Sequence, residues 1–210
     1  MKSTLRLVLA LALALGARAA SATEEHHFGV DLSLHGGLDK YDSVGLRNGL
    51  QGLNLSDSSQ LKDASQHVGA TAILRLSALE LGAIAEIGRP GKSDATTAIG
   101  ALGGVGLDFA SLRFEALAEA GGHRYGSVLK DSALVTHSSK DVWLAYVGLR
   151  PGLSYRPSGS AWILGVWAFA RWDLSNKTIP VTLASDGSSA GDYKLGGSQY
   201  GAGLRLGFSL

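Results

Sequence analysis

The chain has 210 residues, of which 45% are hydrophobic and 18% charged. This composition supports an ordered fold of one or two domains and excludes a disordered chain. The absence of cysteine excludes disulfide frameworks, thiolate metal sites and cysteine nucleophiles. The 29 glycines are about twice the usual share, and most lie inside apolar segments, which favours closely packed strands.

The first 22 residues have the pattern of a cleavable secretory signal peptide, with a basic start, an apolar stretch from Leu7 to Gly16 and small residues at 20–22. The apolar stretch is shorter than the roughly 20 residues of a membrane-spanning helix. We therefore expect a mature domain of residues 23–210, and a cut after Ala19 is the alternative. Removal of residues 1–22 leaves 16 of the 19 basic residues against 18 acidic ones, a net charge of −2. This balance gives no reason to expect nucleic acid as a partner.

Beyond residue 22, apolar residues alternate with polar or small ones, a pattern that predicts β-strands with one apolar face. The segment from Leu112 to Ala120 has the clearest alternation, with apolar residues opposite Arg113 and Glu115. In chain order, the eight predicted strands span approximately residues 28–35, 68–76, 79–88, 97–109, 112–120, 142–155, 161–173 and 200–210.

The connections between these strands alternate between long and short. In chain order they span residues 36–67, 77–78, 89–96, 110–111, 121–141, 156–160 and 174–199. Tight turns at one rim and long loops at the other are typical of outer-membrane barrels, whose turns are periplasmic and whose loops are extracellular. The sequence therefore predicts an all-β fold, an eight-stranded antiparallel up-and-down transmembrane β-barrel. We expect it in the cell outer membrane with both termini periplasmic.

Charged residues in the predicted strands fall on a single face, and the other face is apolar. A soluble barrel, the alternative, would enclose the apolar face, whereas a membrane barrel turns it toward lipid. The charged face has arginines but no lysines. The planar guanidinium group of arginine pairs well with carboxylates when it is partly buried. Because eight strands leave an interior that side chains can fill, we expect ion pairs to plug the lumen. The predicted network comprises Asp31, Arg75, Glu80, Glu86, Arg113, Glu115, Glu119, Arg150, Arg171 and Arg205, with His35, Asp108 and Asp173 on the same face.

The sequence also suggests partners for two of these arginines and an exposed position for every lysine. Arg113 and Arg205 are expected to pair with Glu80, Glu86, Glu115 or Glu119, because their strands can approach one another across the lumen. The lysines of the mature chain all lie in the predicted long loops, at Lys40, Lys62, Lys92, Lys130, Lys140, Lys177 and Lys194.

Aromatic residues on the apolar face cluster at strand ends. Trp162 and Trp172 are ten residues apart, and in a strand tilted by ~40° this spacing covers roughly 26 Å along the membrane normal. That matches an apolar band of about 25 Å between two aromatic girdles. Trp167 and Phe169 face the lumen instead, where we expect them to fill space. The predicted girdles comprise Phe28, Phe109, Tyr155, Trp162 and Phe208 on the periplasmic side, and Trp143, Trp172 and Tyr200 on the outer side.

The signal peptide, the eight alternating strands, the four long loops and the final strand resemble the OmpA/OmpX-like group of small outer-membrane barrels, over essentially all of residues 23–210. The likeness lies in architecture, without a diagnostic peptide. In that group the last strand commonly ends in an aromatic residue used by the assembly machinery, whereas Leu210 ends this chain and Phe208 precedes it on the same face. We expect outer-membrane lipid, lipopolysaccharide and the assembly machinery as partners of a monomer.

Some barrels of this kind modify lipid A, and those resembling the outer-membrane deacylases use a His-x-Ser pair on a lipid-facing strand. His137 and Ser139 have this spacing but lie in a polar loop without a nearby Glu to orient the imidazole. We therefore predict no catalytic residues.

Metal sites are also weakly indicated. The adjacent His26 and His27 have no third ligand nearby. The remaining acidic candidates are loop pairs without calcium-ligand spacing, namely Asp39 with Asp42, and Asp57 with Asp63. We therefore expect no metal and no cofactor.

Three functions stay open: a structural or surface-interaction protein with a plugged lumen, a narrow channel for small solutes, and a lipid A-modifying enzyme. The expected arginine–carboxylate plug favours the first, with the extracellular loops as the place of interaction.

Overall fold

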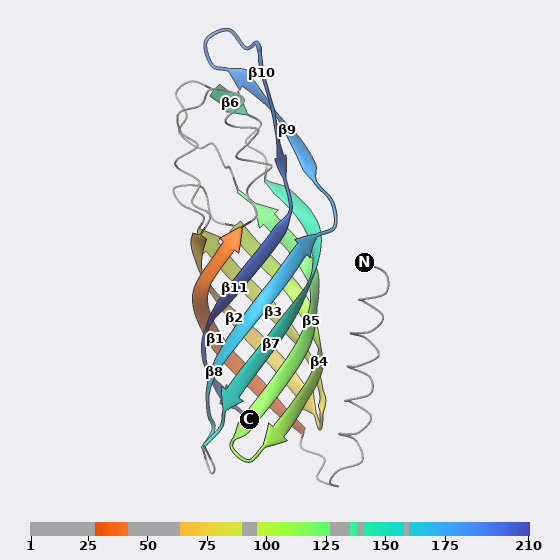
Figure 1. The fold of residues 1–210 in the computed structure, drawn as a ribbon, viewed down its shortest axis with the longest axis vertical. Helices are drawn as coiled ribbons and strands as arrows, with labels where there is room; N and C mark the ends of the chain where they lie inside the picture. Colours follow the sequence, from red (N-terminus) through yellow and green to blue (C-terminus); the bar gives the residue numbers. More distant parts are fainter. Residues whose placement is uncertain (1–27, 42–63, 90–95, 127–134, 138–140, 158–159) are drawn as a thin grey trace.

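The computed structural model describes residues 28–41, 64–89, 96–126, 135–137, 141–157 and 160–210. Eight antiparallel strands close into a barrel in the order β1-β11-β8-β7-β5-β4-β3-β2 (Figure 1). In the described segments, no helix has the length and apolarity to cross a membrane. The barrel strands are β1 (Phe28–Tyr41), β2 (Ala64–Leu76), β3 (Leu79–Arg89), β4 (Thr96–Phe109), β5 (Leu112–Tyr125), β7 (Val142–Tyr155), β8 (Trp162–Asp173) and β11 (Ser198–Ser209).

The barrel closes where β1 meets β11. The two strands pair from Asp31 opposite Ser209 to Tyr41 opposite Gln199. The backbones of Val30 and Leu210 also exchange two hydrogen bonds, of 3.0 and 2.8 Å. Each barrel strand thus has two neighbours, so no strand edge stays unpaired along the wall.

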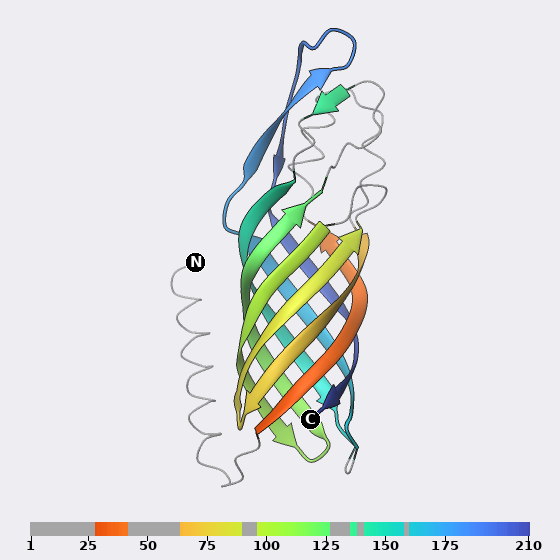
Figure 2. The same cartoon turned by 180° about the vertical axis from the view of Figure 1, so that it is seen from behind.

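The short connections all lie at one rim. Ser77 and Ala110 open two of them, and both have left-handed backbones (φ 59° and 54°), as tight hairpin turns require. β1 begins and β11 ends at this same rim (Figure 2). We call this end the turn rim and the opposite end, where the long connections lie, the loop rim.

A second, smaller sheet stands beyond the loop rim. It consists of β6 (Val135–His137), β9 (Lys177–Leu183) and β10 (Ser189–Leu195), in the order β10-β9-β6, and we call it the loop sheet. β9 and β10 form a hairpin that rises above the barrel (Figures 1 and 2). The expectation that residues 121–141 and 174–199 are loops alone was wrong, because both contain strands of this sheet.

The eight barrel strands and the alternating connection lengths are confirmed, but several strands extend further toward the loop rim than predicted. β1 continues to Tyr41 beyond the predicted end at 35, β2 begins at Ala64, and β5 continues to Tyr125. Polar residues enter the sequence here, so the apolar alternation fades although backbone pairing continues. The predicted signal peptide, residues 1–22, lies outside the described residues and stays a prediction.

Inward-facing glycines leave space for large side chains in the lumen and for close approach of neighbouring strands. At Gly100 a Cβ atom would lie 2.5 Å from the hydroxyl of Tyr146, and at Gly121 it would overlap the carbonyl oxygen of Ile99. The missing side chains therefore allow a large residue to cross the lumen and neighbouring backbones to approach closely.

Candidate functional site

The outward face of the barrel is apolar. All eight predicted girdle residues point outward and are exposed. At the turn rim, the rings of Trp162 and Phe208 are in contact at a tilt of 42°, with centroids 4.1 Å apart. At the loop rim, the rings of Trp172 and Tyr200 meet edge to face at 6.4 Å. The sequence analysis missed Phe114, whose exposed ring contacts that of Phe109 at 5.7 Å. Its alternation with Leu112 was the available signal.

The inward face contains all ten residues of the predicted ion-pair network, and each makes at least one ion pair. They separate into two groups along the barrel axis. We call the group toward the turn rim the turn-side cluster and the other the loop-side cluster.

The turn-side cluster balances four carboxylates against four arginines. Arg113 Nε donates to Glu80 at 2.7 Å, and Arg113 also pairs with Asp108. Arg205 pairs with Glu115 at 2.5 Å, so the structure brings both arginines to partners named in advance. Of the other three charges, Asp31 and Arg75 were predicted, whereas Arg156 was not, because it lies in a short connection. The cluster comprises Asp31, Arg75, Glu80, Asp108, Arg113, Glu115, Arg156 and Arg205.

The loop-side cluster is more tightly cross-linked. Glu119 accepts hydrogen bonds from Arg150 Nε at 3.2 Å and from Arg171 Nε at 2.8 Å. The same two arginines pair with Glu86. Two carboxylates and two guanidinium groups thus form a buried ring with no excess charge, in which removal of one member leaves the others without a full set of partners.

Two further side chains complete this ring. The hydroxyl of Tyr146 donates to Glu119 at 2.6 Å, and Nε2 of His35 lies 2.7 Å from Glu86. Tyr146 was not predicted, although it shares the inward parity of Arg150. The aromatic rings of Trp167 and Phe169 face the lumen as expected, and Arg150 stacks over Trp167 at 4.2 Å. Such contacts stabilise guanidinium groups away from water.

Two further carboxylates lie above this ring, toward the loop rim. Asp39 accepts hydrogen bonds from Ser65 and Gln199, and its Oδ1 lies 3.3 Å from Nδ1 of His67. Asp173 lies 3.5 Å from Nδ1 of His123. The expectation that Asp39 lies in a loop was wrong, because β1 continues and turns its side chain into the barrel, whereas Asp42 lies outside the described residues. Extending the strand parity by a few residues would have found Asp39, His67 and His123, and Asp173 was already on the predicted inward face.

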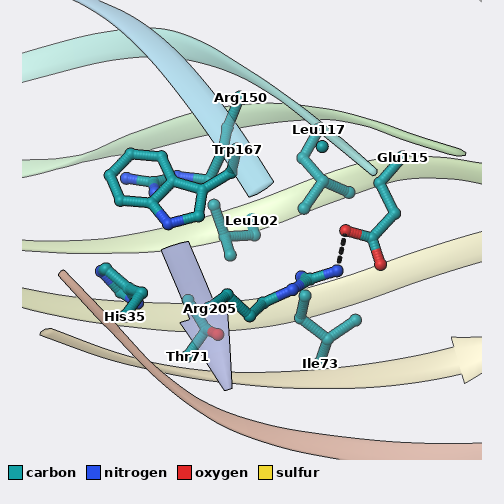
Figure 3. Close-up of a pocket in the computed structure, with 10 residues that line it drawn as sticks. His35, Thr71, Ile73, Leu102, Glu115, Leu117, Arg150, Trp167 and Arg205 are labelled. Carbon is teal, nitrogen blue, oxygen red and sulfur yellow. Dashed lines mark hydrogen bonds and ion pairs between the residues drawn. The ribbon is translucent and has the colours of Figure 1, made fainter. Parts of the chain in front are cut away.

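A small cavity separates the two clusters (Figure 3). It has about 10 Å³ of space for the centre of a water molecule, which is roughly the minimum that holds one water. Two buried N–H donors at its wall, Trp167 Nε1 and Arg205 Nε, have no hydrogen-bond partner among the described residues. The packed apolar residues Ile73, Leu102 and Leu117 form much of the rest of its lining.

The lysines are only partly where they were expected. Lys40 lies in β1 on the outward face, and Lys177 and Lys194 lie in the hairpin of β9 and β10. These positions correct the expectation that all lysines are in loops, because the strands extend beyond the apolar band. The other four, Lys62, Lys92, Lys130 and Lys140, lie outside the described residues.

Most of the weak catalytic and metal candidates lie outside the described residues. His137 belongs to β6 and pairs with Val181 of β9, whereas Ser139, His26, His27, Asp42, Asp57 and Asp63 lie outside the described residues. Within the described part of the chain, no group of three His, Asp or Glu side chains could hold a metal ion.

No family model and no curated protein matches the sequence. Among solved structures, Neisserial surface protein A (NspA) is similar over 87% of this chain and 99% of its own, with a TM-score of 0.53 and 12% sequence identity. The chain has the fold of the small eight-stranded outer-membrane barrels. The outer membrane protease OmpT from Escherichia coli aligns over 90% of this barrel's chain and 100% of its own, with a TM-score of 0.41 and 9% identity. At 12% identity, the likeness to NspA establishes the fold alone and assigns no role to any residue.

Proposed function

We propose that the protein is an integral outer-membrane barrel with a structural and surface-interaction role. Its lumen is closed by its own side chains, and its long connections and loop sheet face the cell exterior. The observation that carries this proposal is the content of the barrel, where two buried ion-pair clusters leave a described cavity of about 10 Å³ between them.

The outward face supports a position in the membrane. Large apolar side chains cover the wall between the two rims, and most are more than two-fifths exposed, among them Leu34 and Leu204. A soluble monomer rarely exposes so large a continuous apolar surface. Lipid acyl chains are a suitable surrounding for this apolar surface. The closed sheet forms the backbone hydrogen bonds that lipid cannot provide.

The interior supports a closed lumen. In the loop-side cluster, Glu86 and Glu119 each pair with both Arg150 and Arg171, which fixes four long side chains across the interior. A passing solute would have to separate these pairs in a poorly hydrated space, and this leaves buried charges without partners. The closed interior therefore favours a structural role over a small-solute channel.

The orientation follows from the two rims. The turn rim has short turns and both ends of the barrel sheet, as the periplasmic side of such barrels does, and the loop rim has the long connections. The loop sheet and its neighbouring connections then form the surface that meets other molecules outside the cell.

The test uses the mature chain refolded into lipid. Folding is checked first by heat-modifiability on SDS gels, where a band that shifts on boiling is expected. A band that does not shift and fractionates with soluble protein would contradict the membrane barrel itself.

Conductance across planar bilayers then tests the closed lumen. We expect no steady open steps from the wild-type protein. The double variant Arg150→Ala/Arg171→Ala removes two lumen-filling side chains and is expected to produce a leak. Steady steps from the wild type, equal to those of the double variant, would instead support the narrow channel.

A further inference from the structure

The outward face of the barrel strands has charged side chains at three positions, and all three are cations. They are Lys40 on β1, Arg89 on β3 and Arg124 on β5, each the last or second-last residue of a strand that ends at the loop rim. The described residues place no outward charge at the turn rim. The positive charge on the outer surface is therefore confined to one end of the barrel, on one contiguous part of the wall.

Two of these cations are unpaired with any described carboxylate. Arg124 donates to Asp141 at 2.7 Å and is thereby neutralised. Lys40 and Arg89 are exposed and have no such partner among the described residues. Within the described part of the chain, no carboxylate neutralises these two cations, so each can pair with an anionic group from outside the protein.

Arg89 and Lys40 belong to a row of hydrogen-bond donors that crosses four adjacent strands. Arg89 lies opposite Gln66 in the pairing of β3 with β2, and Lys40 lies opposite Tyr200 in the pairing of β1 with β11. Leu38 is the partner of Gln66 on β1, so Lys40 lies one outward position further toward the loop rim. Neighbouring strands are about 4.8 Å apart, which gives the row a width of roughly 14 Å. We call Arg89, Gln66, Lys40 and Tyr200 the donor row.

Directly below the donor row, toward the turn rim, an outward glycine lies among four exposed apolar side chains, and we call this place the notch. Gly36 faces outward on β1 between Leu34 and Leu38, and it is paired with Val68 and Leu204 on the adjoining strands. These four side chains are 63–70% exposed, among the highest values on the barrel. Because Gly36 has no side chain, they border bare backbone.

We propose that the donor row and the notch together bind one phosphorylated lipid, the lipid A part of lipopolysaccharide. The headgroup phosphates accept hydrogen bonds from Arg89 and Lys40, and an acyl chain lies in the notch at Gly36. A guanidinium group suits a phosphate because its N–H groups can bond two oxygens at once, and an ammonium group adds a compact charge. This inference rests on the proposed function, which places the loop rim in the outer leaflet.

The rest of the loop rim does not offer the same combination. Trp143 and Trp172 occupy the outward positions there on β7 and β8, and the cation beside Trp143, Arg124, is already paired with Asp141. An aromatic ring suits the interface between lipid and water without preference for a phosphate. Charge complementarity therefore assigns the lipid to the wall formed by β3, β2, β1 and β11.

The test measures binding of diphosphorylated lipid A to the refolded mature chain by native mass spectrometry in detergent. Lys40→Gln/Arg89→Gln removes both cations and is expected to weaken binding roughly thirtyfold, because each cation near an anionic surface contributes about a fivefold gain in affinity. The matched control is Arg124→Gln, a cation at the same rim that is already paired, which should stay within about twofold of the wild type.

Two further arms separate the headgroup from the acyl chain. Lipid A stripped of both phosphates is expected to bind the wild type and the double variant equally. Gly36→Val fills the notch at a position where a Cβ atom meets only ordinary contacts of 3.5 and 3.6 Å, and it should weaken binding of both forms of the lipid.

Unchanged binding of diphosphorylated lipid A by the double variant would overturn the inference, as would an equal loss in Arg124→Gln. Each variant is also checked for the heat-dependent gel shift. A wild type without that shift contradicts the proposed function, whereas a shifting wild type whose binding ignores Lys40 and Arg89 contradicts this inference alone.

Discussion

Arg113 and Phe28 lie on opposite faces of the barrel wall, and their exposures reverse the usual relation between polarity and burial. The guanidinium-bearing Arg113 is 1% exposed, whereas Phe28 is 71% exposed. Inside, charged groups satisfy one another because the closed sheet excludes most water. Outside, apolar groups need a solvent other than water. The inner face of the wall is therefore surrounded by polar side chains and the outer face by lipid. Substitutions should lower the free energy of unfolding most where they put a group into the environment of the opposite face.

The largest effect is expected inside the wall. Glu119→Ala removes the carboxylate that Arg150, Arg171 and Tyr146 share. Breaking a buried ion pair from one side typically costs about 3–5 kcal/mol, because the remaining charges stay buried without partners. Urea unfolding in phospholipid vesicles measures the change in the free energy of unfolding.

The matched control breaks an exposed ion pair outside the lumen. Asp141→Asn removes the partner of Arg124, where both side chains are more than a third exposed. Exposed pairs contribute only about 0–1 kcal/mol. Equal losses in the two variants would mean that Glu119 is hydrated, and thus that the lumen is open to water.

A charge on the outward face should have a slightly smaller effect that depends on depth. Ala101 faces outward midway along β4, and Ala101→Arg places a cation near the centre of the apolar band. The expected loss is about 2–4 kcal/mol, against about 0–1 kcal/mol for Ser198→Arg at the loop rim. Equal tolerance of both variants in vesicle unfolding would contradict lipid contact at Ala101.

Glycines provide a third contrast between the faces. At Gly121 a new Cβ atom would overlap Ile99 O and lie 2.6 Å from Gly100 Cα, both rigid backbone atoms. Gly121→Ala should therefore cost about 1–3 kcal/mol by overpacking. At Gly103, on the outward face, the nearest atom is a side-chain carbon of Leu81 at 3.7 Å, so Gly103→Ala should be neutral or slightly stabilising. Thermal unfolding of the two variants separates these outcomes, and a lower midpoint for Gly103→Ala would count against the assigned face.

The smallest effect is expected beyond the wall, in the loop sheet. The backbone N–H and hydroxyl of Ser188 donate to Asp186 at 2.9 and 2.7 Å and hold the pKa of that carboxyl below its ordinary value. The ionised group therefore stabilises the turn above the pKa of the unfolded chain, about 3.9. This contribution is lost as the pH falls through the lower pKa of the folded chain. An NMR titration should return the pKa toward its ordinary value in Ser188→Ala; no change would show that Ser188 does not hold the carboxylate.

The sequence was sufficient to predict the barrel because each face keeps one polarity over most of a strand. The alternation around Arg113 and Glu115 identifies both faces at once. It fails near the loop rim, where Asp39 and His67 are polar inside and Lys40 and Gln66 are polar outside, so alternation no longer marks the strand. The hairpin of β9 and β10 lies beyond the apolar band. β9 alternates Ile179, Val181 and Leu183 with Thr178, Pro180 and Thr182, so a strand signal was present there and was missed.

Ion-pair partners were less predictable than ion-pair members. Parity alone places Arg171 inside the barrel, but its contacts with Glu86 and Glu119 depend on which strands face each other across the lumen and at what height. Alternation along a single strand does not contain that information. Arg156 was missed for a related reason, because it follows the end of β7 and reaches back to Asp31.

Tryptophan fluorescence in lipids with brominated acyl chains measures the division between the two faces most directly. The chain has four tryptophans, and Trp143, Trp162 and Trp172 face outward, whereas Trp167 is buried in the lumen against Arg150. Single-tryptophan variants, with the other three changed to phenylalanine, report each position separately. We expect bromine to quench the three outward residues strongly and to leave Trp167 almost unquenched. Quenching of Trp167 as strong as that of the other three would contradict the assignment of an outer lipid face and a closed inner face.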